Sequence, residues 1–83
     1  MRKVFVYALF NKINTEIYVG IAFDPVTRLN EHNRGKNRYT KAFRPWNIFF
    51  TEEHKNFAEA RAKEKYYKSA AGKRYLKKIL DYS

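Results

Sequence analysis

The chain contains 83 residues, a length that leaves room for one domain, and we expect that domain to span residues 1–83. It has no cysteine, which excludes disulfides, thiolate zinc sites and a cysteine nucleophile and favours a reducing compartment. Eighteen Lys and Arg stand against eight Asp and Glu, giving a formal net charge of +10. This surplus predicts a polyanionic partner, of which nucleic acid is the commonest; a solubilising surface, a ribosomal protein and a membrane-surface protein are the alternatives.

The first apolar segment, Val4–Phe10, is rich in β-branched and aromatic residues and predicts a buried strand. Arg2 and Lys3 precede it as in a signal peptide, but the segment is too short and no small-residue cleavage site follows. No apolar run reaches the length that crosses a bilayer. We therefore expect a cytoplasmic protein without a membrane partner, and we take it to be a monomer.

A second segment of the same character, Ile17–Phe23, comes after a polar turn, so the two segments predict an antiparallel hairpin. Asp24 and Pro25 then predict the start of a helix, because Asp can cap free backbone amides and Pro suits the first helical position. The helix is expected to reach about Arg34, with Gly35 as its left-handed end.

The segment 34–44 contains five basic residues and no acidic one, and it predicts a loop with one helical turn. In residues 46–51, Trp46, Ile48 and Phe50 alternate with the residues between them, which predicts a third strand.

Two further helices are expected. Asn56 and Glu59 resemble a capping box, which opens a helix that runs to Lys68. Residues 70–82 place their apolar side chains on one stripe, as in a helix that packs on a core. The resulting order, β-β-α-β-α-α, predicts an α+β fold in which helices flank a three-stranded antiparallel sheet.

Several of these segments carry the motifs of a known family. Phe5-Val6-Tyr7 and Tyr18-Val19-Gly20 stand where its members have Gly-Ile-Tyr-like and Tyr-Ile-Gly triplets, and the two tyrosines are eleven positions apart. Arg28–Lys36 is similar to its Arg-Leu-x-Glu-His-Asn-x-Gly-Lys helix, and Ala60–Lys68 to its Ala-x-x-x-Glu-x-x-x-Lys helix. Residues 39–46 resemble the loop and third strand of its small stand-alone members. Although the first triplet lacks glycine, the chain resembles the GIY-YIG nuclease family along nearly its whole length.

The resemblance implies an endonuclease that hydrolyses phosphodiester bonds with the help of a divalent metal ion, Mg²⁺ or Mn²⁺. DNA is favoured over RNA as the partner, and DNA repair is the expected context. So small a surface predicts little sequence specificity, and a preference for particular DNA structures is left open. The alternative is a nucleic-acid-binding module of the same fold with little or no cleavage activity.

Glu64 is the implied metal ligand. An ideal helix places it on the same stripe as Phe57, Ala60 and Tyr67, and this stripe is expected to face the sheet. A carboxylate on an apolar stripe is costly unless it is paired or bound to a metal. An ion pair with Lys68, four residues further on, is the structural alternative. Position alone leaves both open, and the resemblance favours the metal.

Four more residues complete the implied catalytic set. Arg28 and His32 share one helix face and are implied as the phosphate clamp and an assisting residue; a solvated arginine and a structural histidine are the alternatives. Tyr7 is implied as the general base and Tyr18 as a residue that positions water or phosphate. A phenol with a pKa near 10 is a poor base at pH 7 unless nearby cations or a metal favour its ionised form. Two half-buried strand aromatics are the alternative.

The basic segment 34–44 includes Tyr39 and Phe43, which predicts contacts with backbone phosphates and stacking on an unpaired base; a solvated loop is the alternative. Thr40 either contacts phosphate or closes the loop, and His54 is expected to be an exposed loop residue without a role. The nucleic-acid-binding residues that we expect are Arg34, Lys36, Arg38, Thr40, Lys41, Arg44 and Lys68.

Overall fold

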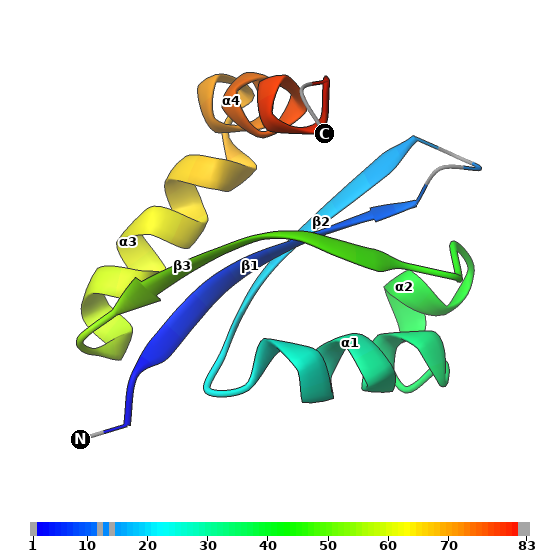
Figure 1. Ribbon diagram of the computed structural model, residues 1–83, viewed down its shortest axis with the longest axis horizontal. Coiled ribbons are helices and arrows are strands. Elements are labelled where there is room, and N and C mark those ends of the chain that lie inside the picture. Colours follow the sequence, from blue (N-terminus) through cyan, green and yellow to red (C-terminus); the bar gives the residue numbers. More distant parts are fainter. Residues whose placement is uncertain (1, 12, 14, 82–83) are drawn as a thin grey trace.

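The computed structural model describes residues 2–11, 13 and 15–81 (Figure 1). Its strands are β1 (Val4–Asn11), β2 (Glu16–Ala22) and β3 (Asn47–His54). Its helices are α1 (Pro25–Asn33), α2 (Arg38–Lys41), α3 (Phe57–Lys68) and α4 (Ala70–Asp81). The strands form one antiparallel sheet with the spatial order β2-β1-β3. The expected α+β fold and the order β-β-α-β-α-α are confirmed, and α2 is the expected single helical turn.

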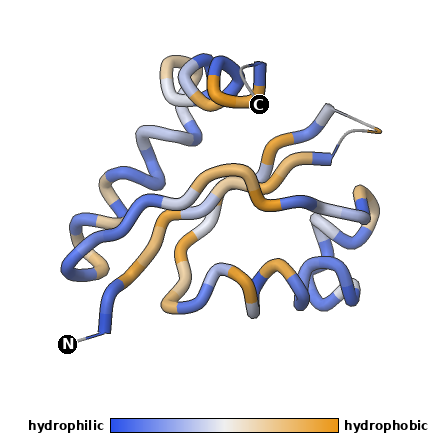
Figure 2. The backbone as a smooth tube through the Cα atoms, viewed as in Figure 1, coloured by the Kyte–Doolittle hydropathy of each residue, from blue (hydrophilic) through white to orange (hydrophobic). Residues whose placement is uncertain are grey.

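Each face of the sheet packs on a different pair of helices (Figure 1). Along β1, Val4, Val6 and Ala8 point to the face covered by α3 and α4, where they join a mostly apolar core. Tyr7 and Leu9 point to the opposite face, which α1 and α2 cover. Figure 2 shows the long hydrophobic stretches of β1 and β2 that this two-sided burial requires. Strand β2 lies at one edge of the sheet, and side chains of α1 and α3 reach the same hollow beside it.

Local sequence signals set the helix ends as expected. The Asp24 carboxylate accepts hydrogen bonds from the amides of Val26 and Thr27, at 3.1 and 3.2 Å, and Pro25 opens α1. Gly35 follows that helix with a φ of 84°, the left-handed conformation that favours glycine. Among the described residues, no helix combines the length and the apolar character needed to span a membrane.

The regular alternation expected for residues 46–51 is interrupted in the structure. Ile48 pairs with Leu9 and Phe50 pairs with Ala8, so Phe49 is one residue too many opposite β1. Such a β-bulge turns the following side chains over. Ile48 therefore packs toward α1 and α2, whereas Phe49 and Phe50 both pack toward α3 and α4.

The expectation that His54 is an exposed loop residue is wrong. It is the last residue of β3, and its Nε2 lies 2.8 Å from an oxygen of Glu52. The other oxygen of Glu52 accepts a hydrogen bond of 2.6 Å from the hydroxyl of Tyr67 on α3. His54 is therefore half-buried in a polar link between β3 and α3, because the strand continues three residues beyond the alternating segment.

Candidate active site

Four of the five predicted catalytic residues meet in one hollow of about 220 Å³ beside the edge strand β2. They reach it from separate elements: Tyr7 from β1, Tyr18 from β2, Arg28 from α1 and Glu64 from α3. Its other lining residues are Gly20, Ile21, Phe57 and Arg61. Because α1 and α3 lie on opposite faces of the sheet, this edge is where side chains from both helices can face one another. We call this hollow the active-site hollow.

The fifth residue, His32, lies directly behind the hollow in a chain of hydrogen bonds. Its Nε2 is 3.0 Å from the hydroxyl oxygen of Tyr7, and its Nδ1 is 2.7 Å from the hydroxyl oxygen of Thr40. A neutral imidazole carries one N–H donor and one acceptor nitrogen. When the Tyr7 hydroxyl donates to Nε2, Nδ1–H therefore donates to Thr40. His32 and Thr40 are both buried.

The loop around α2 holds this chain of hydrogen bonds in place. Trp46, which is almost fully buried, donates from its indole N–H to the carbonyl oxygen of Thr40 at 2.9 Å. The Asn33 side chain exchanges two hydrogen bonds with the backbone of Trp46, at 3.0 and 2.6 Å. These bonds join the end of α1, the helix α2 and the start of β3. The position of the His32 ring is therefore fixed by partners on both sides.

The surroundings of Tyr7 and His32 keep both side chains neutral at pH 7. Burial, reinforced by Tyr18, raises the pKa of Tyr7 to about 12, although Arg28 acts in the opposite direction. Burial, followed by the positive charge of Arg28, lowers the pKa of His32 below its ordinary value of 6.5. The pair therefore consists of a protonated phenol and a neutral imidazole, with the phenol oriented toward the imidazole.

Gly20 leaves room for the phenol of Tyr7. A Cβ atom at position 20 would lie 2.6 Å from the hydroxyl oxygen and 2.7 Å from the ring carbon that carries it. Tyr7 pairs with Gly20 across the two strands, and its ring lies over the glycine backbone. The glycine of the second triplet is thus required for a close approach, and the missing side chain opens the hollow to the hydroxyl group.

Arg28 lies at the solvent side of the hollow. Its side chain is about half exposed, and its guanidinium donates to the Glu31 carboxylate at 3.1 Å. Arg28 also contributes to a smaller hollow of about 110 Å³, together with His32 and Lys36. A guanidinium in this position can receive an anionic oxygen while the phenol and imidazole stay covered.

Glu64 supplies the hard oxygen atoms of the hollow. Its side chain is only 14% exposed, with Lys68 Nζ at 3.1 Å from one carboxylate oxygen and Arg61 Nε at 3.8 Å from the other. In the part of the chain that the structure describes, no group of three or more His, Asp or Glu side chains could hold a metal. The residues therefore do not fit zinc, which takes three or four protein ligands. They fit Mg²⁺, which often binds one carboxylate and completes its shell with water and substrate phosphates.

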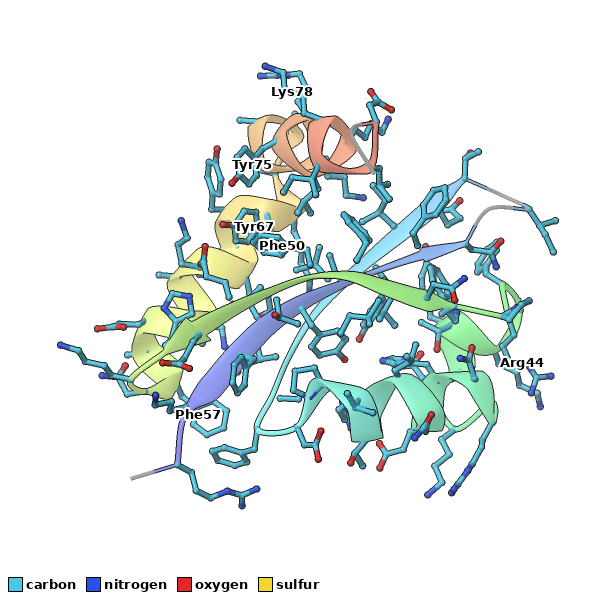
Figure 3. All side chains as sticks on the ribbon, viewed as in Figure 1. Arg44, Phe50, Phe57, Tyr67, Tyr75 and Lys78 are labelled. Carbon is cyan, nitrogen blue, oxygen red and sulfur yellow. The ribbon has the colours of Figure 1, made fainter. Side chains whose placement is uncertain are left out.

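Four residues of the hollow were not predicted as site residues: Gly20, Ile21, Phe57 and Arg61. Phe57 was expected to face the sheet, but it is 50% exposed and lies at the start of α3 (Figure 3), where it contacts the ring of Phe23. Arg61 was seen only as part of the family motif. Its spacing of three residues from Glu64 is the helical signal that could have identified it.

The basic residues expected to bind nucleic acid occupy two kinds of position. Arg34, Lys36, Arg38, Lys41 and Arg44 are all exposed. Figure 3 shows Arg44 directed away from the body of the protein.

The other two predicted binding residues lie closer to the catalytic set. Lys68 is half exposed and ion-paired with Glu64. Thr40 is fully buried beneath the surface, with its hydroxyl against His32, and this position favours the closing of the loop over contact with a phosphate.

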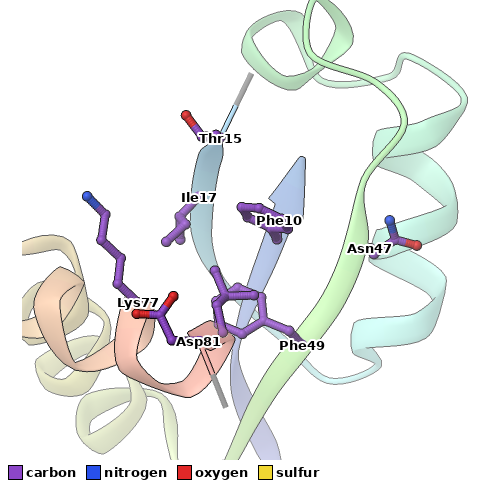
Figure 4. A pocket seen from close by; sticks show the side chains of 8 residues that line it. Phe10, Thr15, Ile17, Asn47, Phe49, Lys77 and Asp81 are labelled. Atoms are coloured by element: carbon purple, nitrogen blue, oxygen red, sulfur yellow. The ribbon is translucent and has the colours of Figure 1, made fainter. Parts of the chain in front are cut away.

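A larger hollow, of about 720 Å³, lies elsewhere. It lies between the hairpin end of the sheet and α4 (Figure 4). Its lining includes the apolar side chains of Phe10, Ile17, Phe49 and Leu80, together with Lys77 and Asp81. It contains none of the predicted catalytic residues. The larger hollow is therefore not the one in which the predicted catalytic residues meet; they meet in the smaller active-site hollow.

Known proteins resemble the chain in sequence and in fold. The sequence model of the GIY-YIG catalytic domain matches residues 3–78, whereas no curated protein shows significant sequence similarity to the chain. The fold is similar to that of the UPF0213 protein BH0048 from Bacillus halodurans, determined in solution by NMR. The TM-score is 0.56 at 28% identity, and the match covers 93% of this chain and 84% of the other. GIY-YIG nucleases generally use divalent metals. The family match extends over most of the chain, which therefore belongs to the GIY-YIG nuclease family.

Proposed function

We propose that the chain is a divalent-metal-dependent endonuclease that hydrolyses phosphodiester bonds of DNA with little sequence specificity. The observation that carries the proposal is the meeting of Tyr7, Tyr18, Arg28 and Glu64 in one hollow, with His32 hydrogen-bonded behind Tyr7. Binding alone requires none of these residues to converge. A carboxylate next to a phosphate would even oppose binding, so its presence favours chemistry.

The proposed reaction begins with proton transfer through Tyr7. With a pKa of about 12, its hydroxyl loses a proton too rarely at pH 7 to serve as a simple base. His32 removes this obstacle, because its neutral Nε2 lies 3.0 Å away and can accept the phenol proton. As water attacks the phosphorus atom, its proton passes to the Tyr7 oxygen and the phenol proton passes to His32. The bond from phosphorus to the leaving oxygen then breaks, and that oxygen takes a proton from solvent.

Arg28 and Tyr18 act on the phosphate and the water in this proposal. The guanidinium of Arg28 donates to a non-bridging oxygen whose negative charge grows in the transition state. Tyr18 lines the same hollow, and in this proposal its hydroxyl positions the water or the phosphate. Glu64 would hold the metal ion, which supplies positive charge to the phosphate and helps to orient it when bound. Thr40 serves as a positioning residue in this proposal: when Nε2 of His32 accepts from Tyr7, Nδ1 carries the ring proton and the Thr40 hydroxyl oxygen, 2.7 Å away, can accept from it.

The exposed cations explain how so small a protein would hold DNA without reading its sequence. Lys36 lines the smaller hollow of about 110 Å³ together with His32 and Arg28, so the basic segment 34–44 begins next to the predicted catalytic residues. Lys and Arg side chains neutralise backbone phosphates, which are the same at every sequence. The net charge of +10 adds a long-range attraction for the polyanion.

A plasmid-nicking assay tests the proposed function. Supercoiled DNA is incubated with the protein in Mg²⁺, in Mn²⁺ and in excess chelator, and nicked product is measured over time. We expect nicking with either ion and none with chelator. Retarded migration of uncut plasmid under every condition would instead identify a nucleic-acid-binding module, and nicking that survives chelation would refute the metal requirement.

A further inference from the structure

Another hollow, of about 310 Å³, lies beside the active-site hollow, and we call it the side hollow. It shares Tyr18 with the active-site hollow, and its wall includes Lys68, which is ion-paired with Glu64 at 3.1 Å. Its lining residues are Ile17, Tyr18, Val19, Tyr39, Lys68 and Lys73. A polynucleotide that placed one phosphate in the active-site hollow would therefore bring its neighbouring nucleotide to the side hollow.

Tyr39 gives the side hollow an aromatic wall that remains open to solvent. The residue belongs to α2 and is 54% exposed, whereas its neighbour Thr40 is fully buried. The Tyr39 ring contacts Phe43 and Tyr18, with ring centroids 5.5 and 6.4 Å apart. These two contacts hold the ring in place and leave much of its surface free. A fixed and exposed ring can stack on a planar ligand at little cost in side-chain entropy.

Two lysine side chains line the same hollow as this ring. Lys68 ends α3 and Lys73 lies in the first turn of α4, and both are exposed. No acidic side chain lines the side hollow among the described residues. A flat ring beside two ammonium groups matches a ligand with both a planar ring and a negative charge, and a nucleotide has both.

We propose that the side hollow binds one unpaired nucleotide adjacent to the scissile phosphate, with its base stacked on Tyr39 and its phosphate near Lys68 and Lys73. A base within a duplex already stacks on its neighbours and cannot present a face to Tyr39, so the nucleotide must be unpaired. The preferred substrate is then DNA with a single-stranded segment next to the cleavage point. This inference rests on the proposed function for the site of cleavage, but its binding step can be measured without any cleavage.

Binding is tested in chelator with a short single-stranded DNA that carries one fluorescent purine analogue. Stacking on a tyrosine quenches such a fluorophore. We expect the unmodified protein and Tyr39→Phe to quench it, and Tyr39→Ala and Tyr39→Leu to lose the quenching and bind about tenfold to a hundredfold more weakly. Tyr39→Leu keeps apolar contact with Tyr18 and Phe43, so it separates loss of stacking from loss of fold, and circular dichroism checks folding in each variant.

The matched control is Tyr75→Ala. Tyr75 is 47% exposed, similar to Tyr39, but it lies against Phe50 and Tyr67 toward the opposite edge of the sheet (Figure 3). We expect it to leave quenching unchanged. Equal quenching by the unmodified protein and folded Tyr39→Leu would overturn the proposal, as would equal losses in the Tyr39 and Tyr75 variants.

Cleavage of two DNAs of equal sequence, a continuous duplex and one with a single-stranded flap, separates this inference from the proposed function. We expect Tyr39→Ala to slow cleavage of the flap substrate about tenfold or more while duplex cleavage changes about twofold at most. Cleavage of both DNAs with no dependence on Tyr39 would refute the side hollow and leave the nuclease intact. Tyr39-dependent quenching with no cleavage of either DNA would refute the nuclease and support the side hollow as a nucleotide-binding site.

Discussion

Each face of the sheet buries a tyrosine, Tyr67 on one side and Tyr7 on the other, and the two hydroxyl groups have different partners. On the α3 and α4 face, Tyr67 packs in an apolar core with Phe50 and Tyr75, and its hydroxyl donates a hydrogen bond to Glu52 at the rim. On the α1 and α2 face, Tyr7 begins a buried chain of hydrogen bonds through His32 and on to Thr40. Burial raises the pKa of both phenols. The difference is that only Tyr7 has a neutral base as its partner and a hollow at its hydroxyl group, so a raised pKa alone does not identify a catalytic tyrosine.

The largest contrast between the two faces is expected from removing one hydroxyl group at a time. Tyr7→Phe should lower single-turnover cleavage about a thousandfold, because it removes the group that takes the proton from water. Tyr67→Phe should leave cleavage within about twofold. Each variant loses one hydrogen bond, so each should lower the free energy of unfolding by about 1 kcal/mol, measured by urea denaturation. Comparable cleavage by the two variants would mean that the two faces do not divide chemistry from packing.

The second contrast compares the same substitution, arginine to lysine, in α1 and in α4. Arg28→Lys keeps the charge but loses the two-pronged guanidinium, so cleavage should fall about a hundredfold while the fold is retained. Arg74→Lys, on the exposed surface of α4, is the control and should leave the rate unchanged. Single-turnover rates on the same DNA measure both variants. Near-normal cleavage by Arg28→Lys would show that Arg28 does not clamp the phosphate.

The third contrast adds one methyl group on each side of the sheet, by Gly20→Ala and by Gly72→Ala. It has the smallest expected effect on cleavage. In Gly20→Ala the new atom crowds the hydroxyl end of Tyr7, a side chain that can shift, so cleavage should fall about tenfold with little loss of stability. In Gly72→Ala the new methyl group would clash with the backbone carbonyl oxygen of Tyr66, where α4 packs against α3. That variant should lose about 2 kcal/mol of stability and keep its rate per folded molecule. Thermal unfolding and single-turnover cleavage together test the pair, and a reversed pattern would contradict it.

The side of the sheet on which the motif residues lie was predictable, because strand alternation and helical periodicity determine where their side chains point. Tyr7 and Tyr18 face the same side of a hairpin, and Glu64 turns toward the edge of the sheet on a helix of known start. Phe57 shares that helical stripe and was placed wrongly. Helical periodicity predicts toward which side of the helix a side chain points. It does not predict how far the sheet extends along the helix, and Phe57, the first residue of α3, is not covered by the sheet.

Other features depend on pairings that a single segment does not reveal. The bulge at Phe49 arises only where β3 meets β1, so alternation within residues 46–51 could not show it. The role of Thr40 was left open for a similar reason, since its hydroxyl meets His32 only after α1 and α2 fold together. The hydrogen bond from Tyr67 to Glu52 likewise joins α3 to β3, and Glu52 also contacts His54. This bond between two elements could not be inferred from one segment alone.

The central claim is that the Glu64 carboxylate belongs to a hydrolytic centre, and Glu64→Gln tests it most directly. Glutamine keeps the shape and removes the charge. Glu53→Gln is the control, because Glu53 is exposed on β3 and forms an ion pair with Lys3, at 2.9 Å. Filter-binding affinity and single-turnover cleavage are measured with Mg²⁺ on the same preparations.

We expect Glu64→Gln to bind DNA as well as or better than the unmodified protein and to cleave it about a thousandfold or more slowly. The reason is that the lost interaction is worth several kcal/mol and each 1.36 kcal/mol is a factor of about ten in rate. If Glu64 only forms its ion pair with Lys68, the variant will lose a fraction of a kcal/mol in stability and cleave at the normal rate, and that result would contradict the account.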